Sequence, residues 1–246
     1  MRLAIVSDIH GNLAALEAVQ AELERERPDF VLQGGDLALN GPRPAEVVDR
    51  VRELGWPGVV GNTDEMLWNP GRRDRLGQTA VKLARQIEIM FDELAPVTCE
   101  WLGPERLGWM SSLPLESRQG SLLLLHATPG DLWRAPAPDA SEDELAGTYG
   151  DLDAGLVVYG HIHQPYVRRV DGLTVANSGS VGLPLDGDRR AGYLLVDDGD
   201  ASVRRVEYDL ERHLHDLTRS EYPNRGWLAE VARAGRVVSP MRTGAD

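Results

Sequence analysis

A short apolar run followed at once by an Asp and a His, close to the N-terminus, is the feature that most constrains the fold. The run spans residues 3–6, and Asp8 and His10 come directly after it. Such a run bounded by turn residues is typical of a buried parallel strand. Side chains two positions apart at its end point the same way, so Asp8 and His10 can converge on one divalent transition metal. The alternative is that Asp8 caps the next helix and His10 lies on a loop.

The same arrangement recurs four more times along the chain. Residues 30–32, 59–60, 122–125 and 156–159 are apolar runs, and each is closely followed by a carboxylate, an amide or an imidazole. In open α/β sheets, ligands bind at the edge formed by the carboxyl ends of the strands. Four of the six histidines belong to the set, which chance placement explains poorly. We therefore expect one site that contains Asp8, His10, Asp36, Asn62, His126, His161 and His163.

The length and composition favour a single domain. A chain of 246 residues with 42% apolar residues suits one α/β domain with a sizeable core. We expect one domain over 1–246, with a helical insertion at about 67–114 and a C-terminal helical tail at about 209–246. The insertion is expected to lie over or beside the site, and the alternative is that its helices only cover the sheet.

The charge of the chain excludes some classes of partner. A formal net charge of −13 argues against unspecific binding to DNA, RNA or anionic membranes, which needs a basic surface. It is compatible with a small anionic substrate held by metal ions. A single cysteine rules out an internal disulfide framework. With no secretory leader and no apolar run of about 18 residues, the sequence predicts a cytoplasmic protein and leaves its oligomeric state open.

Hydrophobic spacing predicts alternating strands and helices in the first quarter of the chain. Helices are expected at 11–27 and 46–54, between strands at 3–6, 30–33 and 58–60. This alternation implies right-handed crossovers and a parallel sheet.

The rest of the chain mixes helices and hairpins. Helices are expected within 74–94, where Leu76, Thr79 and Ala80 begin an apolar stripe, and again at 101–111. His213 and His215 are expected to be solvated on a C-terminal helix. The remaining expected elements are strands at 156–159, 166–170, 173–176, 193–196 and 202–208, and helices at 209–218 and 226–234.

Together these motifs resemble those of the calcineurin-like metallophosphoesterase superfamily, in particular its small bacterial and archaeal phosphodiesterase-type members. The resemblance spans about residues 3–205 and implies a four-layer α-β-β-α sandwich with a helical insertion and a dinuclear metal site. The motifs that carry it are Asp8-x-His10, Gly35-Asp36, Gly61-Asn62-x-Asp64, His126 after a strand, and Gly160-His161-x-His163.

The resemblance also implies how the ligands are shared between two metals. By analogy Asp36 bridges the two ions and, with Asn62 and Asp64, belongs to the catalytic residues. Mixed nitrogen and oxygen ligation without a thiolate suits two divalent ions of Mn, Fe, Ni, Co or Zn, among which the sequence does not choose. Such a pair generates hydroxide and stabilises both the entering and the leaving oxygen. The first metal is assigned Asp8, His10, Asp36 and His163, and the second Asp36, Asn62, His126 and His161.

The chain departs from many relatives at Thr63. Those relatives have a His directly after the Asn, where it is thought to protonate the leaving group, and Asp64 corresponds to its partner. A threonine hydroxyl cannot be a general acid at neutral pH. This favours esters with good leaving groups, or diesters positioned by the metals. Alternatively, a metal-bound water protonates the leaving group.

The resemblance implies a hydrolase, most simply a phosphodiesterase acting on a small or nucleotide-derived phosphate ester. The alternatives are a phosphomonoesterase, a protein phosphatase, a dinucleoside polyphosphate hydrolase, a weakly active regulatory protein that binds metal and phosphate, or a protein whose ligands are only structural. Fold alone does not choose among them. Substrate contacts are weighed against plain structural roles at Asn12, Asn40, Arg43 and Arg134.

Overall fold

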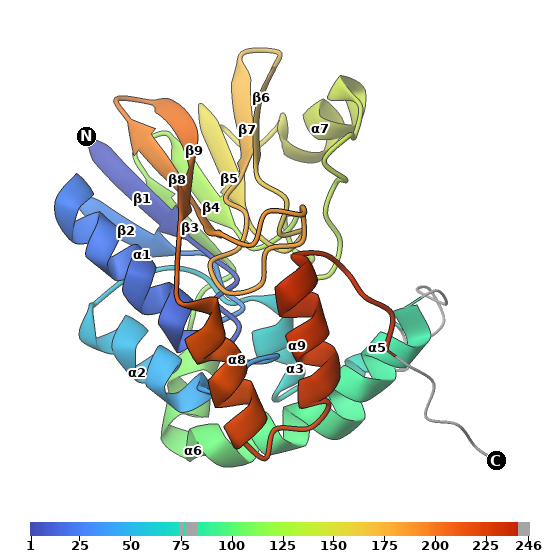
Figure 1. The fold of residues 1–246 in the computed structure, drawn as a ribbon. Helices are drawn as coiled ribbons and strands as arrows, with labels where there is room; N and C mark the ends of the chain where they lie inside the picture. The colour runs from blue at the N-terminus through green and yellow to red at the C-terminus, as the bar shows by residue number, and fades with distance from the viewer. Residues whose placement is uncertain (74–75, 77–82, 241–246) are drawn as a thin grey trace.

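Two β-sheets packed face to face form the centre of the protein (Figure 1). The structure is a computed structural model that describes residues 1–73, 76 and 83–240. The four-stranded sheet has the order β2 (Phe30–Gln33), β1 (Arg2–Val6), β8 (Ala191–Asp197) and β9 (Asp200–Val206). The five-stranded sheet has the order β3 (Glu116–Gln119), β4 (Leu122–Leu125), β5 (Leu156–Tyr159), β7 (Leu173–Asn177) and β6 (Tyr166–Val170).

Both sheets are mixed: the parallel pairing expected for the first strands is found between β1 and β2, and the two expected hairpins are β6–β7 and β8–β9. The parallel pairs are β1–β2, β4–β5 and β5–β7, while β8 and β6 join as antiparallel strands. The expected strand at 58–60 is wrong, because Gly58 makes only an isolated bridge with Gln33. The N–H of Val60 donates to the carbonyl of Pro114 at 2.9 Å, so the segment leaves the sheet instead of extending the ladder.

Alternating side chains on each strand separate three layers of apolar packing. Leu3 and Ile5 of β1 face the five-stranded sheet, whereas Ala4 and Val6 face helices on the other side. The same alternation divides the four leucines of β4, of which Leu123 and Leu125 pack against α7 (Glu142–Tyr149). Helix, sheet, sheet and helix therefore follow one another, which confirms the four-layer α-β-β-α sandwich.

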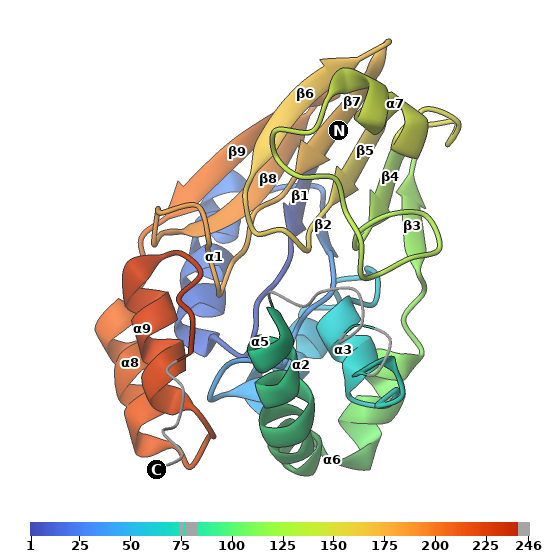
Figure 2. The same cartoon turned by 90° about the vertical axis from the view of Figure 1, so that its right-hand side faces the viewer.

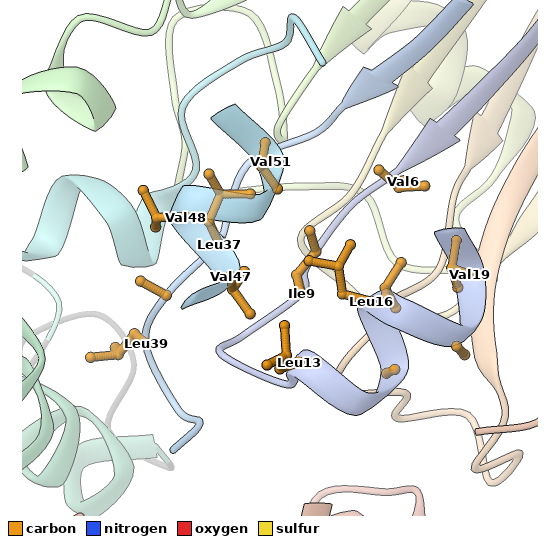
Figure 3. Packing of buried hydrophobic residues seen from close by; sticks show 14 of the residues in the cluster. Val6, Ile9, Leu13, Leu16, Val19, Leu37, Leu39, Val47, Val48 and Val51 are labelled. Atoms are coloured by element: carbon orange, nitrogen blue, oxygen red, sulfur yellow. The ribbon is translucent and has the colours of Figure 1, made fainter. Parts of the chain in front are cut away.

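Helices α1 (Leu13–Glu26) and α2 (Pro44–Glu53) cover the outer face of the four-stranded sheet, close to the expected bounds. Figure 3 shows Ile9, Leu13 and Leu16 packed near Val6, with α2 beside them. Helix α1 begins where the side chain of Asn12 accepts a hydrogen bond from the N–H of Ala15 at 3.1 Å.

The other helices on this side gather beyond one end of the sheets (Figure 2). The stretch between 83 and 111 is helical where it is described, whereas Thr79 and Ala80 of the expected stripe lie outside the described residues. Within the described part of the chain, no helix is both long and apolar enough to cross a bilayer. The elements are α3 (Asn62–Met66), α5 (Ala84–Glu88), the π-helical segment η2 (Ile89–Leu94), α6 (Ala95–Ser111), α8 (Leu210–Arg219) and α9 (Arg225–Ala234).

One of the two histidines expected on the surface is buried. His213 is 5% exposed, whereas His215 is exposed. His213 belongs with Leu210, Leu214 and Leu217 to the helical i, i+3, i+4, i+7 stripe with which α8 packs on the core. The expectation was wrong because the apolar neighbours on this face decide its burial, rather than its own polarity.

Burial of His213 predicts a loss of stability in mild acid. Burial lowers the pKa of its imidazole to about 4, below its usual value of 6.5. As the pH falls below 6.5 the unfolded chain therefore takes up a proton that the folded protein resists until about pH 4. Between about pH 7.5 and about pH 5, the wild type should lose about 2 kcal/mol of unfolding free energy because of His213. His213→Gln should lack this part of the loss.

Urea denaturation at the two pH values measures this difference. His215→Gln is the matched control, because its exposed side chain should leave the loss unchanged. Equal pH-dependent losses in wild type and His213→Gln would refute the prediction.

Candidate metal centre

Five loops bring the seven expected side chains together at the carboxyl ends of the strands. Two ligands follow β1, one follows β2, one begins α3, one follows β4 and two follow β5. All of them except His161 are buried. The seven are Asp8, His10, Asp36, Asn62, His126, His161 and His163.

Four of these side chains form one group whose ligand atoms all lie within 4.8 Å of one another. The group contains Asp8, His10, Asp36 and His163. The Nε2 of His163 lies 3.1 Å from the Oδ1 of Asp8 and 3.2 Å from the Nε2 of His10. The Nε2 of His10 lies 3.7 Å from the Oδ2 of Asp36. These are the ligands that the resemblance assigns to a first metal.

The other side of Asp36 faces a second group. Its Oδ1 lies 3.6 Å from the Nε2 of His126. The Oδ1 of Asn62 lies 2.8 Å from that same nitrogen and 2.8 Å from the Nδ1 of His161. Asp36 therefore presents one carboxylate oxygen to each group.

The histidine hydrogen bonds show that this ligand set fits a cation. In His10, His126 and His163 the Nδ1 donates to a backbone carbonyl at 2.8, 2.8 and 2.6 Å. A proton on Nδ1 leaves the Nε2 of a neutral imidazole as a bare lone pair. When both rings are neutral, the two Nε2 atoms of His10 and His163 face each other as lone pairs at 3.2 Å. A metal ion between the ring nitrogens and the carboxylates removes this repulsion.

The pKa shifts in the first group also indicate that its environment favours a positive charge. Burial disfavours the charged form of His163, but the charges of Asp8 and Asp36 outweigh it and raise its pKa. Burial, and then the charge of His163, lowers the pKa of His10 to about 4. Burial opposes ionisation of Asp8, yet the neighbouring imidazoles hold its pKa below the usual range.

The second group behaves in the same way. Burial lowers the pKa of His126, but the charge of Asp36 and of the carboxylates around it raises it overall. Burial, and then the charge of His126, lowers the pKa of His161 to about 3. Burial raises the pKa of Asp36. Each group thus holds one favourable position for positive charge, surrounded by neutral imidazoles.

The backbone of the ligand loops is held in an unusual conformation. Asp8, His10, Asp36, His161 and His163 have φ values of 56°, 49°, 56°, 65° and 57°, in the left-handed region. Such a conformation costs a non-glycine residue roughly 1–3 kcal/mol and persists only where the surroundings enforce it. The strain here aims five ligands from three separate loops at one space.

Glycines allow these loops to approach the carboxylates. A Cβ atom at Gly160 would overlap the carboxylate of Asp8, and one at Gly61 would overlap the carboxylate of Asp36. The glycines of the Gly61-Asn62 and Gly160-His161 motifs are therefore required by packing around the ligands.

Asp64 ties two of the ligand loops together. Its Oδ2 accepts the N–H groups of Asp36 at 2.8 Å and Gly61 at 3.0 Å, and its Oδ1 accepts that of Leu37 at 2.9 Å. The side chain is completely buried. Its visible role is to position the Asp36 loop, and its expected catalytic role stays a prediction.

Thr63 contacts the ligand set through its backbone rather than through its hydroxyl. Its N–H donates to the Oδ1 of Asp36 at 2.8 Å. Its Oγ1 is buried and has no hydrogen-bond partner among the described residues. The hydroxyl therefore contributes no internal bond to the site.

Several weighed residues turn out to have structural partners. The side chain of Asn12 caps α1 and donates to the carbonyl of Gly182 at 3.0 Å. Arg43 pairs with Glu46 at 2.9 Å. Arg134 lines a separate hollow beside His161. Asn40 lies next to His10, with its Oδ1 buried and without a partner among the described residues.

Gln33 is a site residue that the sequence reasoning missed. Its Nε2 donates to the carbonyl of Val59 at 3.1 Å, and its Oε1 accepts the N–H of Gly35 at 2.7 Å. The buried amide thus shapes the turn that presents Asp36. The signal was a polar residue at the end of an otherwise apolar strand.

The anchoring by Asp64 predicts a large effect on stability. Asp64→Ala leaves three buried N–H groups without their acceptors, and each such group costs about 1–3 kcal/mol. We expect the unfolding free energy, measured by urea denaturation with a chelator present, to fall by about 3 kcal/mol or more. The neighbouring Thr63→Val is the control, because it removes a hydroxyl without partners and should change stability by less than about 1 kcal/mol. Similar losses in the two variants would contradict the anchoring role.

Residues 1–200 match the family model of the calcineurin-like phosphoesterase superfamily domain. The chain is 29% identical over 261 residues to the uncharacterized protein MJ0912 of Methanocaldococcus jannaschii, covering 95% of this chain and 98% of that protein. It is 25% identical over 213 residues to phosphodiesterase YfcE of Escherichia coli K12, covering 82% and 91%.

Solved structures agree with this similarity. A metallophosphoesterase from Sphaerobacter thermophilus matches with a TM-score of 0.77 and 27% identity, covering 96% of this chain and 99% of that one. Protein PH1004 from Pyrococcus horikoshii shares the fold, with a TM-score of 0.81 and 17% identity over 95% and 98%. The chain therefore belongs to the calcineurin-like phosphoesterase superfamily and is a hydrolase that acts on phosphate ester bonds.

Proposed function

We propose that the protein is a phosphodiesterase that hydrolyses a small phosphate ester with two divalent transition-metal ions, drawn from Mn, Fe, Ni, Co or Zn. The observation that carries the proposal is the position of Asp36, whose two oxygens each face a different group of ligands. A single carboxylate placed in this way can serve two cations at once. The buried lone pairs of both groups support the same arrangement.

The composition of the ligand set suits an anionic substrate. Two ions of this kind supply positive charge for the phosphoryl oxygens and lower the pKa of water. Only Asp8 and Asp36 among the seven ligands carry negative charge, so the imidazoles and the amide of Asn62 leave much of that positive charge for the substrate. The hydrogen-bonded Nδ1 atoms keep the imidazoles in the tautomer that this role requires.

The surroundings of Thr63 support a preference for esters that leave without a strong general acid. Among the described residues that line the cavity next to Thr63, the titratable ones are all in the ligand set. The described lining of this cavity thus offers no further imidazole or carboxyl group to protonate an alkoxide. Activated esters and diesters are the substrates that tolerate this. The similarity to a protein named phosphodiesterase favours diesters among them.

The proposal predicts metal-dependent turnover of a diester. After chelation, re-addition of Mn, Ni, Co, Mg or Zn should restore hydrolysis of bis-p-nitrophenyl phosphate more strongly than that of p-nitrophenyl phosphate. Asp36→Asn removes the charge shared by both ligand groups. We expect it to lower kcat/KM for the diester by more than about 100-fold, beyond the about 10- to 100-fold typical of residues that only support ligands.

Asp151→Asn, an exposed carboxylate away from the site, is the control for this loss and should keep full activity. Metal-independent turnover would refute the proposal. Failure to hydrolyse either ester with any metal, in a protein that still binds two ions, would instead identify a regulatory metal- and phosphate-binding protein.

Thr63 provides a second test. Thr63→His places an imidazole beside Asn62 and Asp64, where it can donate a proton to the leaving group. We expect the ratio of kcat/KM for a phenyl or alkyl monoester to that for bis-p-nitrophenyl phosphate to rise by at least about tenfold, part of the about 10²–10⁴-fold that general acids contribute. Thr63→Val is the matched control. An unchanged ratio in Thr63→His would show that position 63 does not decide the preference.

A further inference from the structure

A cavity of about 270 Å³ opens directly from the ligand set. Five ligands contribute to its floor and Asn40 and Thr63 lie at the edge of that floor, while the other described lining residues come from four segments. These segments are residues 83–90 of α5 and η2, the loop at 183–185, helix α9 and residues 237–238. An organic group attached to a phosphoryl group at the floor can therefore extend between these walls. The floor ligands are His10, Asp36, Asn62, His161 and His163.

The walls of this cavity are apolar. Gln86 is the one polar side chain that the described wall residues contribute, and none of them is a Lys or an Arg. A second phosphate group placed against these described residues would lose its hydration, and none of them would supply a cation. An uncharged apolar group would gain free energy by leaving water. The remaining wall residues are Leu83, Met90, Leu183, Leu185, Trp227, Leu228, Val231, Val237 and Val238.

Hydrogen bonds hold the walls against the floor. The hydroxyl of Tyr222, between α8 and α9, accepts the N–H of Asn40 at 3.1 Å and lies 2.8 Å from the Oγ1 of Thr98 on α6. The Asn224 side chain donates to Glu93 of η2 at 2.8 Å. The two helical walls are thus joined to each other and to the loop next to His10, as in a preformed binding site.

Two polar atoms at the boundary between floor and walls have no partner among the described residues. They are the Oγ1 of Thr63 and the Oδ1 of Asn40, and both are buried. Both residues line the cavity. The Nδ2 of Asn40 lies 3.5 Å from the Nδ1 of His10, which already donates to Leu39. Buried polar groups normally have partners, so the amide oxygen of Asn40 and the hydroxyl of Thr63 indicate that a ligand binds at this boundary.

We propose that this cavity binds an uncharged, apolar ester group of the substrate, such as an aryl or short alkyl group. The inference rests on the proposed phosphoesterase function and specifies its substrate class: an ester with a single phosphoryl group, rather than a polyphosphate. The volume of about 270 Å³ lies just below the usual range of about 300–1,000 Å³ for small-molecule pockets. A small organic group therefore fills it.

Binding of alkylphosphonates to the metal-loaded protein tests the proposal. Methyl-, propyl- and butylphosphonate share one anionic head and differ only in apolar length. We expect affinity, measured by calorimetry and as competitive inhibition of bis-p-nitrophenyl phosphate hydrolysis, to rise about fourfold for each added methylene. 3-Carboxypropylphosphonate, of similar length but with a charged end, should lose this gain.

Variants locate the gain in the cavity. Met90→Gln and Val231→Thr each introduce a polar group into one wall, so each should lower the ratio of butyl- to methylphosphonate affinity by about threefold or more. Val167→Thr makes the same kind of change on β6, away from the cavity, and should keep the wild-type ratio. Two variants on different helices separate an effect of the cavity from a local disturbance.

The possible failures are distinguishable. An affinity that does not depend on chain length, or that is greater for the carboxylate, in a protein that hydrolyses the diester would overturn the inference and leave the proposed function intact. Loss of all phosphonate binding together with a lack of hydrolysis would refute the proposed function and the inference with it.

Discussion

Electron pairs that face one another in a buried space are the constraint on which this structure depends. Three imidazoles have their Nδ1 protons committed to carbonyl groups, so the Nε2 atoms of neutral His10 and His163 meet as bare lone pairs 3.2 Å apart. The left-handed backbone at five ligands, the glycines that touch Asp8 and Asp36, and the three N–H groups held by Asp64 all keep this unfavourable convergence in place. Because the lone pairs and carboxylates around this space repel one another, the fold is suited to bind a cation there.

The positions of the ligands were accessible from the sequence because of a rule about strands. Carboxyl ends of neighbouring strands meet at one edge, so Asp8 and Asp36 could be placed near each other without any coordinates. His126 was placed with them by the same reasoning, although β4 belongs to the other sheet. The side chains that hold the ligand loops by hydrogen bonds could not be predicted in this way. Nothing in the pattern shows that a carboxylate holds three N–H groups, so the anchoring role of Asp64 became visible only in the structure. Gln33 was overlooked because it was considered only as the last residue of a strand.

The fold was predictable to different depths in different places. The spacing of Leu13, Leu16 and Val19 was enough to define α1. Four consecutive leucines in β4 show no alternation, so its two faces became visible only with a sheet on one side and α7 on the other. The two-sheet architecture therefore came from the family resemblance rather than from periodicity. The segment at 58–60 has the local sequence of a strand, but the N–H of Val60 donates to the carbonyl of Pro114, far away in the sequence, instead of to a neighbouring strand. His213 was likewise decided by its neighbours.

The attachment of Tyr222 to Asn40 has a consequence for how this protein relates to its family. The family match ends at residue 200, so α8, α9 and Tyr222 lie outside it, while all seven ligands lie inside. Under the proposed function, the reacting groups lie within the matched residues, whereas the walls of the cavity come partly from them and partly from α9 and residues 237–238, which follow them. A substitution in α9 could then change the accepted ester group without altering a ligand. Inferring a substrate from a relative with the same ligands would therefore require comparison of the cavity walls, including those that follow residue 200.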